Sequence, residues 1–279
     1  MEENYEVRPE VLTYDDICKM VPALCGHKKL VETVMHWVRL DHVNEVHVRW
    51  HKTPGPEFAH HLIEDEFKIR MRVDNEEVLA QFSSSPFITV SNHPFGGLDG
   101  IMLLHLVSKY RPDYKVMVNL ILNQISAMRP NFIAVDPFHS DDPEKRKITM
   151  QGLRKAMKHV REGHPLGFFP AGAVEKIVGF HIEERQWQPS VMRLIKQLRV
   201  PVIPIYFHGR NTMLFHLLAL IDWRLRTTRL PAEIFNKQGK EMHVSVGTPI
   251  SVEEQDKYGS VEALTEFLQQ ETYNLKSLK

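Results

Sequence analysis

The sequence has little cysteine, no net charge and no long hydrophobic run, and each of these excludes a class of protein. Only two of its 279 residues are cysteines, Cys18 and Cys25, and their spacing matches no common metal or redox motif, so we expect a reduced, cytosolic protein. The 35 basic residues balance 35 acidic ones, which leaves none of the overall positive field that a nucleic-acid-binding protein needs. No apolar run reaches about 18 residues, so we expect no membrane-spanning helix.

Two sequence signatures are also missing. The first ten residues, MEENYEVRPE, lack the basic region and the apolar core of a signal peptide, so we expect none. The chain contains no G-x-S-x-G, the pattern that places the nucleophile in serine hydrolases. A lipid or thioester hydrolase therefore stays an alternative without an evident nucleophile.

Strand-like apolar segments alternate with amphipathic, helix-like segments from residue 67 onward. This alternation predicts an α/β fold, with a mostly parallel central sheet flanked by helices. The strand-like segments are 67–73, 87–90, 114–120, 132–135, 166–172, 200–207 and 242–250. The helix-like segments are 100–110, 145–162, 190–198 and 260–278. Two prolines in 200–207 favour a position near a sheet edge or at a bulge.

The N-terminal part of the chain has a different pattern. Thr13 is a candidate N-cap for a helix with acidic residues in its first turn. We therefore expect a helical layer over about residues 1–50, appended to an α/β core at about 85–250. No linker separates the two, so the prediction is a single domain, 1–279.

The stretch SNHPFGGLDG, Ser91 to Gly100, directly follows the apolar run 86–90. Ligands of α/β proteins usually bind where strands end. His93, with an ordinary pKa of about 6.5, suits removal of a proton from a hydroxyl, and Asp99 would fix the ring if the paired glycines turn the chain back. A plain cap or turn at the His-Pro dipeptide is the alternative.

This stretch resembles the first motif of the glycerolipid acyltransferases, the lysophosphatidic acid acyltransferase superfamily. The family separates its His and Asp by four residues, whereas five residues separate His93 from Asp99. The form N-H-P-F-G-G-L-D-G resembles a bacterial branch that includes hemolysin-like acyltransferases and the enzymes that complete amino-acid lipids. The resemblance extends over about residues 85–250.

Two further motifs support the resemblance. The family's F-P-E-G-T-R-S is matched at Phe169, Pro170 and Gly172, but its Glu is replaced by Ala171, which leaves Glu175 as a candidate substitute. In the family this turn holds the acceptor's head group. The family's V-P-x-x-P, which shapes the acyl groove, is matched by 200–204.

The family's second motif is matched poorly. Its equivalent, 132–136, lacks the Arg that binds acceptor phosphate, and a phosphate favours a bidentate guanidinium. This loss favours an acceptor with another head group. Arg210 would supply a charge from another direction, or it is a surface residue that caps a loop.

The resemblance implies transfer of a fatty acyl group from an acyl thioester, on acyl carrier protein or coenzyme A, to the hydroxyl of a lyso-lipid. His93 and Asp99 would be catalytic, and no metal or bound cofactor is expected. The acceptor stays open between a lysophospholipid and a monoacyl amino-acid lipid of the glycine or ornithine type. The residues expected to bind substrate or to stabilise an oxyanion are Asn92, Gly96, Gly97, Phe169, Pro170, Gly172, Glu175 and Arg210.

Two segments are candidates for contact with a lipid surface. The helix at 28–40, with Trp37, is expected to pack on the core. The segment 211–230 is apolar and then basic, with Trp223 at the change, so we expect peripheral binding to the inner face of a bacterial cytoplasmic membrane. A non-catalytic membrane-surface protein is the alternative, but it would not need His93 and Asp99.

Histidines gather between residues 42 and 61, and such clusters sometimes bind metals. Their spacing fits no standard ligand set, and no partner Cys or acid is evident, so no metal site is predicted. The histidines are His42, His47, His51, His60 and His61.

Overall fold

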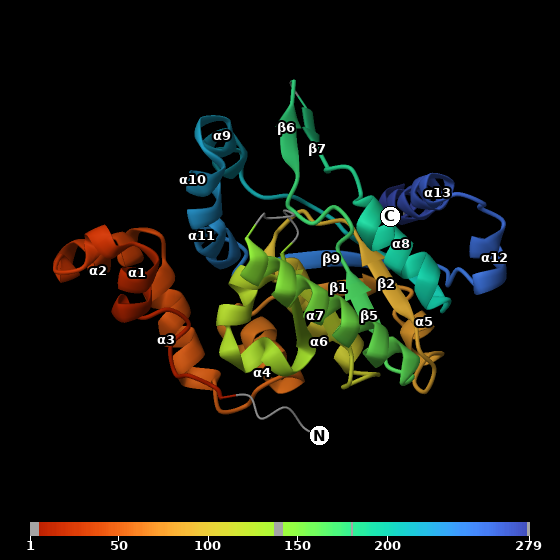
Figure 1. The fold of residues 1–279 in the computed structure, drawn as a ribbon, viewed down its shortest axis with the longest axis horizontal. Coiled ribbons are helices and arrows are strands. Elements are labelled where there is room, and N and C mark those ends of the chain that lie inside the picture. The colour runs from red at the N-terminus through yellow and green to blue at the C-terminus, as the bar shows by residue number, and fades with distance from the viewer. Residues whose placement is uncertain (1–5, 137–141, 180, 278–279) are drawn as a thin grey trace.

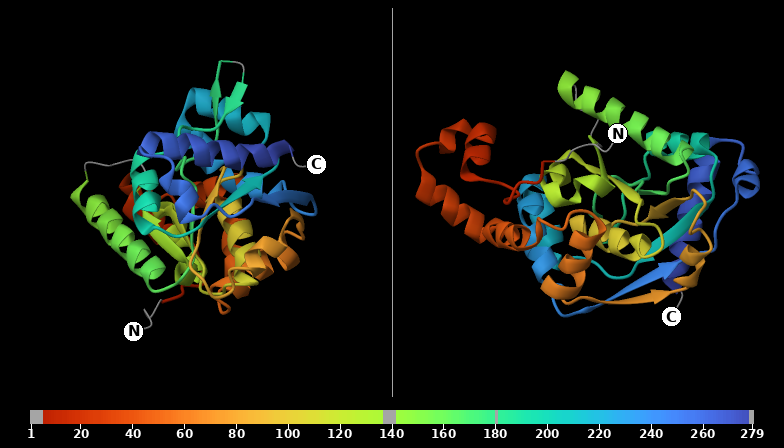
Figure 2. Two further views of the ribbon diagram at one scale, coloured as in Figure 1. Left: turned by 90° about the vertical axis from the view of Figure 1, so that its right-hand side faces the viewer. Right: turned by 90° about the horizontal axis from the view of Figure 1, so that it is seen from below.

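A computed structural model describes residues 6–136, 142–179 and 181–277, apart from the side chains of residues 223 and 224 (Figures 1 and 2). A central sheet carries helices on both faces, and a group of N-terminal helices stands beside it. The predicted α/β class is confirmed. None of the helices in the described ranges is long and apolar enough to cross a membrane.

Seven strands form the sheet in the order β1-β9-β8-β2-β5-β3-β4. The five from β8 to β4 are mutually parallel, β9 is antiparallel to β8, and β1 is parallel to β9. The carboxyl ends of the five parallel strands therefore lie on one edge. The bounds are β1 Arg70–Asp74, β2 Ile88–Ser91, β3 Lys115–Asn119, β4 Phe132–Val135, β5 Leu166–Phe168, β8 Val202–Phe207 and β9 Glu241–Val246.

The expected edge position of 200–207 is wrong, because β8 lies between β9 and β2 and all of its residues are buried. Pro204 lacks an N–H, but its carbonyl accepts a hydrogen bond from the N–H of Gly247. Residue pairing with β9 begins one residue later, at Ile205. A proline is tolerated inside this sheet where the two strands begin to pair.

Two apolar clusters cover the two faces of the sheet. Alternation along a strand separates them: Val116 and Val118 of β3 join one cluster, and Met117 joins the other. The first cluster packs under α4 (Pro56–His61) and α6 (Gly97–Ser108). The second is covered by α7 (Pro143–Arg161), α8 (Pro189–Leu198) and α13 (Val261–Asn274).

The N-terminal helices are α1 (Tyr14–Met20), α2 (Lys28–Trp37) and α3 (Leu40–Trp50). Thr13 caps α1 as predicted, and Asp16 completes a capping box. The expectation that the 28–40 helix packs on the core is wrong. Only Val31 of α2 is buried, whereas Leu30, Val34 and Trp37 are exposed. Figure 1 shows α1 and α2 standing away from the sheet.

The segment 211–230 is not one helix. It forms α9 (Met213–Ile221) and α10 (Trp223–Thr228), and α11 (Leu230–Phe235) follows. Figure 1 shows α9 beside a hairpin of β6 (Lys176–Val178) and β7 (His181–Glu183), with α10 and α11 below it. The remaining elements are a π-helix at Leu62–Glu66, α5 Glu77–Ala80, α12 Val252–Asp256 and 3₁₀ turns at Pro22–Leu24, Leu120–Gln124, Ser126–Asn131 and Leu275–Ser277.

Candidate active site

Several chain segments that follow strands meet at the carboxyl edge of the sheet. His93 lies two residues beyond β2 and Phe169 directly follows β5. Asn119 ends β3, and Asp136 directly follows β4. All four line one cavity of about 500 Å³. The predicted location of the site, just beyond a buried strand, agrees with this arrangement.

His93 and Asp99 face each other across the turn. Asp99 is in the first turn of α6, and its Oδ2 lies 2.9 Å from Nδ1 of His93. The same oxygen accepts hydrogen bonds from the N–H groups of Phe95 and Gly96, each 2.9 Å long. Gly96 has a φ of 81°, which disfavours any side chain. The turn therefore accommodates five intervening residues and still brings the two side chains together.

The aspartate is fully buried, and the histidine side chain is 15% exposed. Burial raises the pKa of Asp99, while the nearby imidazole and the two backbone N–H groups act in the opposite direction. With Nδ1 against the carboxylate, Nε2 is the imidazole nitrogen that remains for a substrate. A His–Asp pair arranged in this way is suited to general-base chemistry.

Asn92 has a different role from the expected substrate contact. Its side chain is buried, its Nδ2 donates to the carbonyl of Phe207, and its Oδ1 accepts from the N–H of Phe207. Both polar groups of the amide are thereby used within the protein. Asn92 joins the end of β2 to the end of β8 and so fixes the backbone that carries His93.

The third motif brings Phe169 and Gly172 to the cavity wall. The ring of Phe169 lies 4.5 Å, centroid to centroid, from the ring of His93. Pro170 is buried and does not line the cavity, and its carbonyl accepts from the N–H of Gln188. Pro170 therefore shapes the turn and does not bind substrate there.

Gly96, Gly97 and Gly172, whose backbone N–H groups were expected to stabilise an oxyanion, differ in what these groups contact. The N–H of Gly96 donates to Asp99, and the N–H of Gly172 donates to the carbonyl of Phe169. Within the described part of the chain, the N–H of Gly97 has no such partner and begins α6. Gly97 itself does not line the cavity, so none of the three glycines places a free N–H on the cavity wall.

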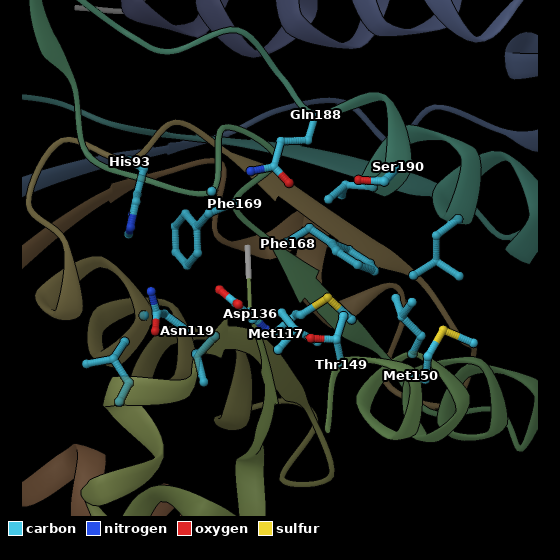
Figure 3. Close-up of a pocket in the computed structure, with 18 of the residues that line it drawn as sticks. His93, Met117, Asn119, Asp136, Thr149, Met150, Phe168, Phe169, Gln188 and Ser190 are labelled. Atoms are coloured by element: carbon cyan, nitrogen blue, oxygen red, sulfur yellow. Dashed lines mark hydrogen bonds between the residues drawn. The ribbon is translucent and has the colours of Figure 1, made fainter. Parts of the chain in front are cut away.

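The cavity extends away from His93 between the sheet and the helices α7 and α8. Figure 3 shows His93 and Phe169 at one end and Met150 at the other. Residues 200–204 do not line it, so the fourth motif contributes buried sheet structure instead of the expected groove. The apolar lining comprises Met117, Val118, Leu122, Val135, Met150, Leu153, Phe168, Phe169, Val191 and Leu194.

Two glutamates lie close to the His–Asp pair. Burial, together with repulsion from Glu184 and Asp99, raises the pKa of Glu175 to about 7, while nearby Arg210 opposes the rise. Burial raises the pKa of Glu184 to about 6, while hydrogen bonds from Tyr273 and Trp187 and, to a smaller extent, His93 oppose this rise. Glu175 and Arg210 therefore influence each other electrostatically, but neither lines the cavity, and their expected contact with substrate stays a prediction.

Sequence reasoning missed Glu184 and the polar residues of the cavity. Glu184 follows β7 and accepts hydrogen bonds from Trp187 and from Tyr273 of the C-terminal helix. No spacing rule connects these residues to residue 93, because the contact is tertiary. Arg146 of α7 lines the cavity although the second motif lacks its Arg. The other polar lining residues are Asn119, Asp136, Thr149, Gln188 and Ser190.

Comparison with known proteins agrees with the motifs. The chain belongs to the family described as Acyltransferase, whose model matches residues 18–279. The protein is therefore an acyltransferase, and the readings as a hydrolase or as a non-catalytic binding protein are set aside.

Two curated relatives are named lyso-glycine lipid O-acyltransferase. They come from Phocaeicola vulgatus and Bacteroides thetaiotaomicron, and each is 25% identical over 193 residues, which cover 67% of this chain and 67% and 68% of the relatives. Among solved structures, the 1-acyl-sn-glycerophosphate acyltransferase PlsC of Thermotoga maritima is 14% identical, with a TM-score of 0.49 over 89% of this chain and 88% of that one.

Proposed function

We propose that this protein is an O-acyltransferase that moves a fatty acyl group from a thioester to the hydroxyl of a lyso-lipid. The observation that carries the proposal is the His93–Asp99 pair at the mouth of a largely apolar cavity. A cavity of about 500 Å³ is within the usual range for small-molecule sites, about 300–1,000 Å³. The apolar lining suits the acyl chain, whose reactive end would then lie beside His93.

In this mechanism Nε2 of His93 removes the hydroxyl proton as the oxygen attacks the thioester carbonyl. Asp99 holds the ring through Nδ1 and stabilises the imidazolium. When the intermediate collapses, the C–S bond breaks, the ester C–O bond is complete, and the proton passes from the imidazolium to the leaving thiolate. The step uses no metal or bound cofactor.

The acceptor that we favour is a lyso-amino-acid lipid of the glycine type. The names of the two curated relatives support this choice. The segment 132–136 lacks the family's phosphate-binding Arg, and the arginine that lines the cavity, Arg146, comes from α7 instead. We place the acceptor's head group near Glu175, whose pKa responds to both Asp99 and Arg210. Acyl carrier protein and coenzyme A are both retained as carriers of the donor.

We further propose that the protein binds the inner face of the cytoplasmic membrane through α9. The exposed residues of α9 form an apolar surface. Arg226 of α10 is buried and donates a hydrogen bond to the carbonyl of Glu175, so the proposal rests on the apolar residues alone. Trp223, expected at the border, has a side chain outside the described part of the structure. The exposed apolar residues of this segment are Met213, Leu214, Leu217, Leu220, Ile221 and Leu225. Replacing Leu220 and Ile221 by Glu should reduce co-sedimentation with anionic vesicles, and unchanged co-sedimentation would remove this part of the proposal.

An acyl-transfer assay tests the function. The purified protein would receive labelled acyl-carrier-protein or coenzyme A thioester together with lyso-glycine lipid or, separately, lysophosphatidic acid. We expect transfer to lyso-glycine lipid that is lost in His93→Ala. Preferential transfer to lysophosphatidic acid would overturn the acceptor, and transfer unaffected by His93→Ala would overturn the catalytic assignment.

A further inference from the structure

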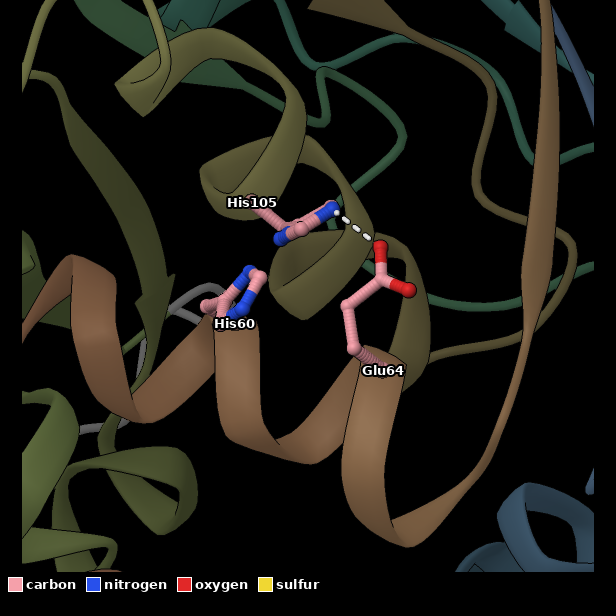
Figure 4. Close-up of side chains that lie close together, drawn as sticks. All are labelled: His60, Glu64 and His105. Atoms are coloured by element: carbon pink, nitrogen blue, oxygen red, sulfur yellow. Dashed lines mark ion pairs between the residues drawn. The ribbon is translucent and has the colours of Figure 1, made fainter.

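Three potential metal ligands meet on the face of α6 that packs against α4, away from the cavity. They are His60 of α4, Glu64 of the following π-helix and His105 of α6. One ligand atom from each lies within 4.8 Å of the other two. Figure 4 shows the three side chains gathered between the two helical segments, with Glu64 directed at His105.

The burial of His105, a polar and ionisable side chain, requires a physical explanation. It is 4% exposed, and in α6, which the structure describes throughout, Asp99 is the only other buried ionisable residue. Its Nε2 lies 3.3 Å from Oε1 of Glu64, longer than the 2.7–2.9 Å or so of a charge-assisted hydrogen bond. Buried polar groups in folded proteins almost always have a well-formed partner, so this imidazole is poorly served by the protein alone.

The other two ligands are available and adjustable. The ring of His60 is exposed and lies 5.5 Å, centroid to centroid, from the ring of His105. Within the described part of the chain, His60 takes part in no hydrogen bond or ion pair. Glu64 sits in a π-helical turn, a backbone feature that often occurs at functional sites, and its side chain is 50% exposed. Both side chains can rotate without disturbing the core.

We propose that His60, Glu64 and His105 bind a zinc-type divalent transition-metal ion. Two imidazoles and one carboxylate form a ligand set that zinc accepts, with a water as the fourth ligand. Metal–ligand bonds of about 2.0–2.2 Å place tetrahedral ligand atoms about 3.4 Å apart, which the Glu64–His105 pair already satisfies. The ion would clamp the 56–66 segment onto α6, six residues along the helix from Asp99.

A second group serves as an internal comparison. Asp74, His208 and His243 also bring their ligand atoms within 4.8 Å of one another. Here the atoms are already engaged: His243 contacts Asp74 at 2.5 Å, and His208 is hydrogen-bonded to Ser245 at 2.8 Å. A metal would have to break these contacts, so we assign it to the first group only.

The test is metal binding to the full, tag-free, chelator-treated chain. Zn²⁺ would be titrated calorimetrically and Co²⁺ followed by its visible absorption, with thermal unfolding measured beside them. We expect one ion per chain and a zinc-dependent rise in melting temperature. His60→Ala and Glu64→Gln change exposed side chains, so both variants should fold, and each should weaken binding about tenfold or more.

Two controls make the result specific. His61→Ala removes a neighbouring histidine that stacks on Trp50 and bonds to Asp65, and His243→Ala disrupts the second group. Both should bind zinc as the unaltered protein does. Absence of stoichiometric binding, binding unaffected by His60→Ala and Glu64→Gln, or binding lost only in His243→Ala would each overturn the proposal. All these readouts are independent of acyl transfer.

Discussion

Two histidine–aspartate pairs of similar length lie on different parts of the sheet. Nδ1 of His93 is 2.9 Å from Asp99, and Nε2 of His243 is 2.5 Å from Asp74. The first pair lies at the carboxyl edge of the parallel strands and faces the cavity. The second joins the neighbouring strands β1 and β9, and its carboxylate also accepts a hydrogen bond from Ser245.

The two pairs differ in the environment of their side chains and not in the His–Asp contact itself. Asp99 is fully buried and its pKa is raised chiefly by burial, whereas the pKa of Asp74 is lowered, because hydrogen bonds from Ser245 and His243 outweigh partial burial. The ring of His243 is covered by His208, with centroids 3.8 Å apart. A His–Asp contact therefore indicates catalysis only where a ring nitrogen also reaches a space for substrate.

The largest difference should be in catalysis. His93→Ala removes the proposed general base and should lower kcat for acyl transfer by about 10²- to 10⁴-fold. His243→Ala should leave kcat within about twofold, because that ring faces no cavity residue. Steady-state acyl transfer with both variants is the measurement. Equal losses in the two variants would contradict the assignment of the catalytic pair.

Replacing the aspartate of each pair by Asn should affect activity and stability differently in the two pairs. Asp99→Asn keeps the shape but loses the charge that stabilises the imidazolium, so kcat should fall by about 10²-fold or more. Its effect on stability should depend on pH in a definite direction. Because the pKa of Asp99 is raised in the folded protein, the free energy of unfolding falls as the pH rises above the ordinary value of 3.8. Asp99→Asn removes the ionisable group and therefore this decline.

Asp74→Asn should do the reverse. Because the pKa of Asp74 is lowered in the folded protein, its ionised form stabilises the fold above about pH 3.8, and this contribution is lost as the pH falls. Asp74→Asn should therefore lower the free energy of unfolding near neutral pH by about 1–2 kcal/mol. The difference from the unaltered protein should shrink in acid, and kcat should be nearly unchanged. Chemical denaturation at several pH values measures both aspartate variants, and parallel pH profiles would contradict the two opposite pKa directions.

The next difference concerns the hydrogen bonds that hold each pair in place and their contribution to the free energy of unfolding. Asn92→Ala leaves the buried N–H and C=O of Phe207 without their partner and should lower the free energy of unfolding by about 2–3 kcal/mol. Ser245→Ala removes partly buried hydrogen bonds to Asp74 and His208 and should lower it by about 1 kcal/mol. Urea denaturation compares them, and a larger effect of Ser245→Ala would reverse the order.

The smallest expected effect concerns the acid beside the first pair. The pKa of Glu175 is raised from 4.5 to about 7, so its ionisation destabilises the fold progressively between these pH values. Glu175→Gln should therefore gain stability relative to the unaltered protein as pH rises from about 5 to 7, by about 1 kcal/mol after allowance for partial exposure. Thermal unfolding across this pH range is the measurement. A difference in melting temperature between the variant and the unaltered protein that does not change with pH would mean that Glu175 is exposed to solvent.

Much of the fold was predictable because strands and helices carry local periodicities. Segments such as 87–90 and 145–162 became β2 and α7 with small shifts at their ends. The helix at 28–40 was predicted correctly as a helix, but its predicted packing on the core was wrong, because an amphipathic pattern does not specify what the apolar face contacts. The same limit explains β8, where two prolines favoured an edge but tertiary pairing placed the strand inside the sheet.

The sequence by itself determined the α/β class, the motif residues His93 and Asp99, and the glycines of their turn, because these depend on neighbours in the chain. Only the tertiary structure decided that Asn92 serves the backbone of Phe207, that Glu184 reaches the site, and that His105 completes a ligand group with His60. These contacts join segments from different helices and strands. Their geometry follows from how the layers pack, which no local pattern of residues records.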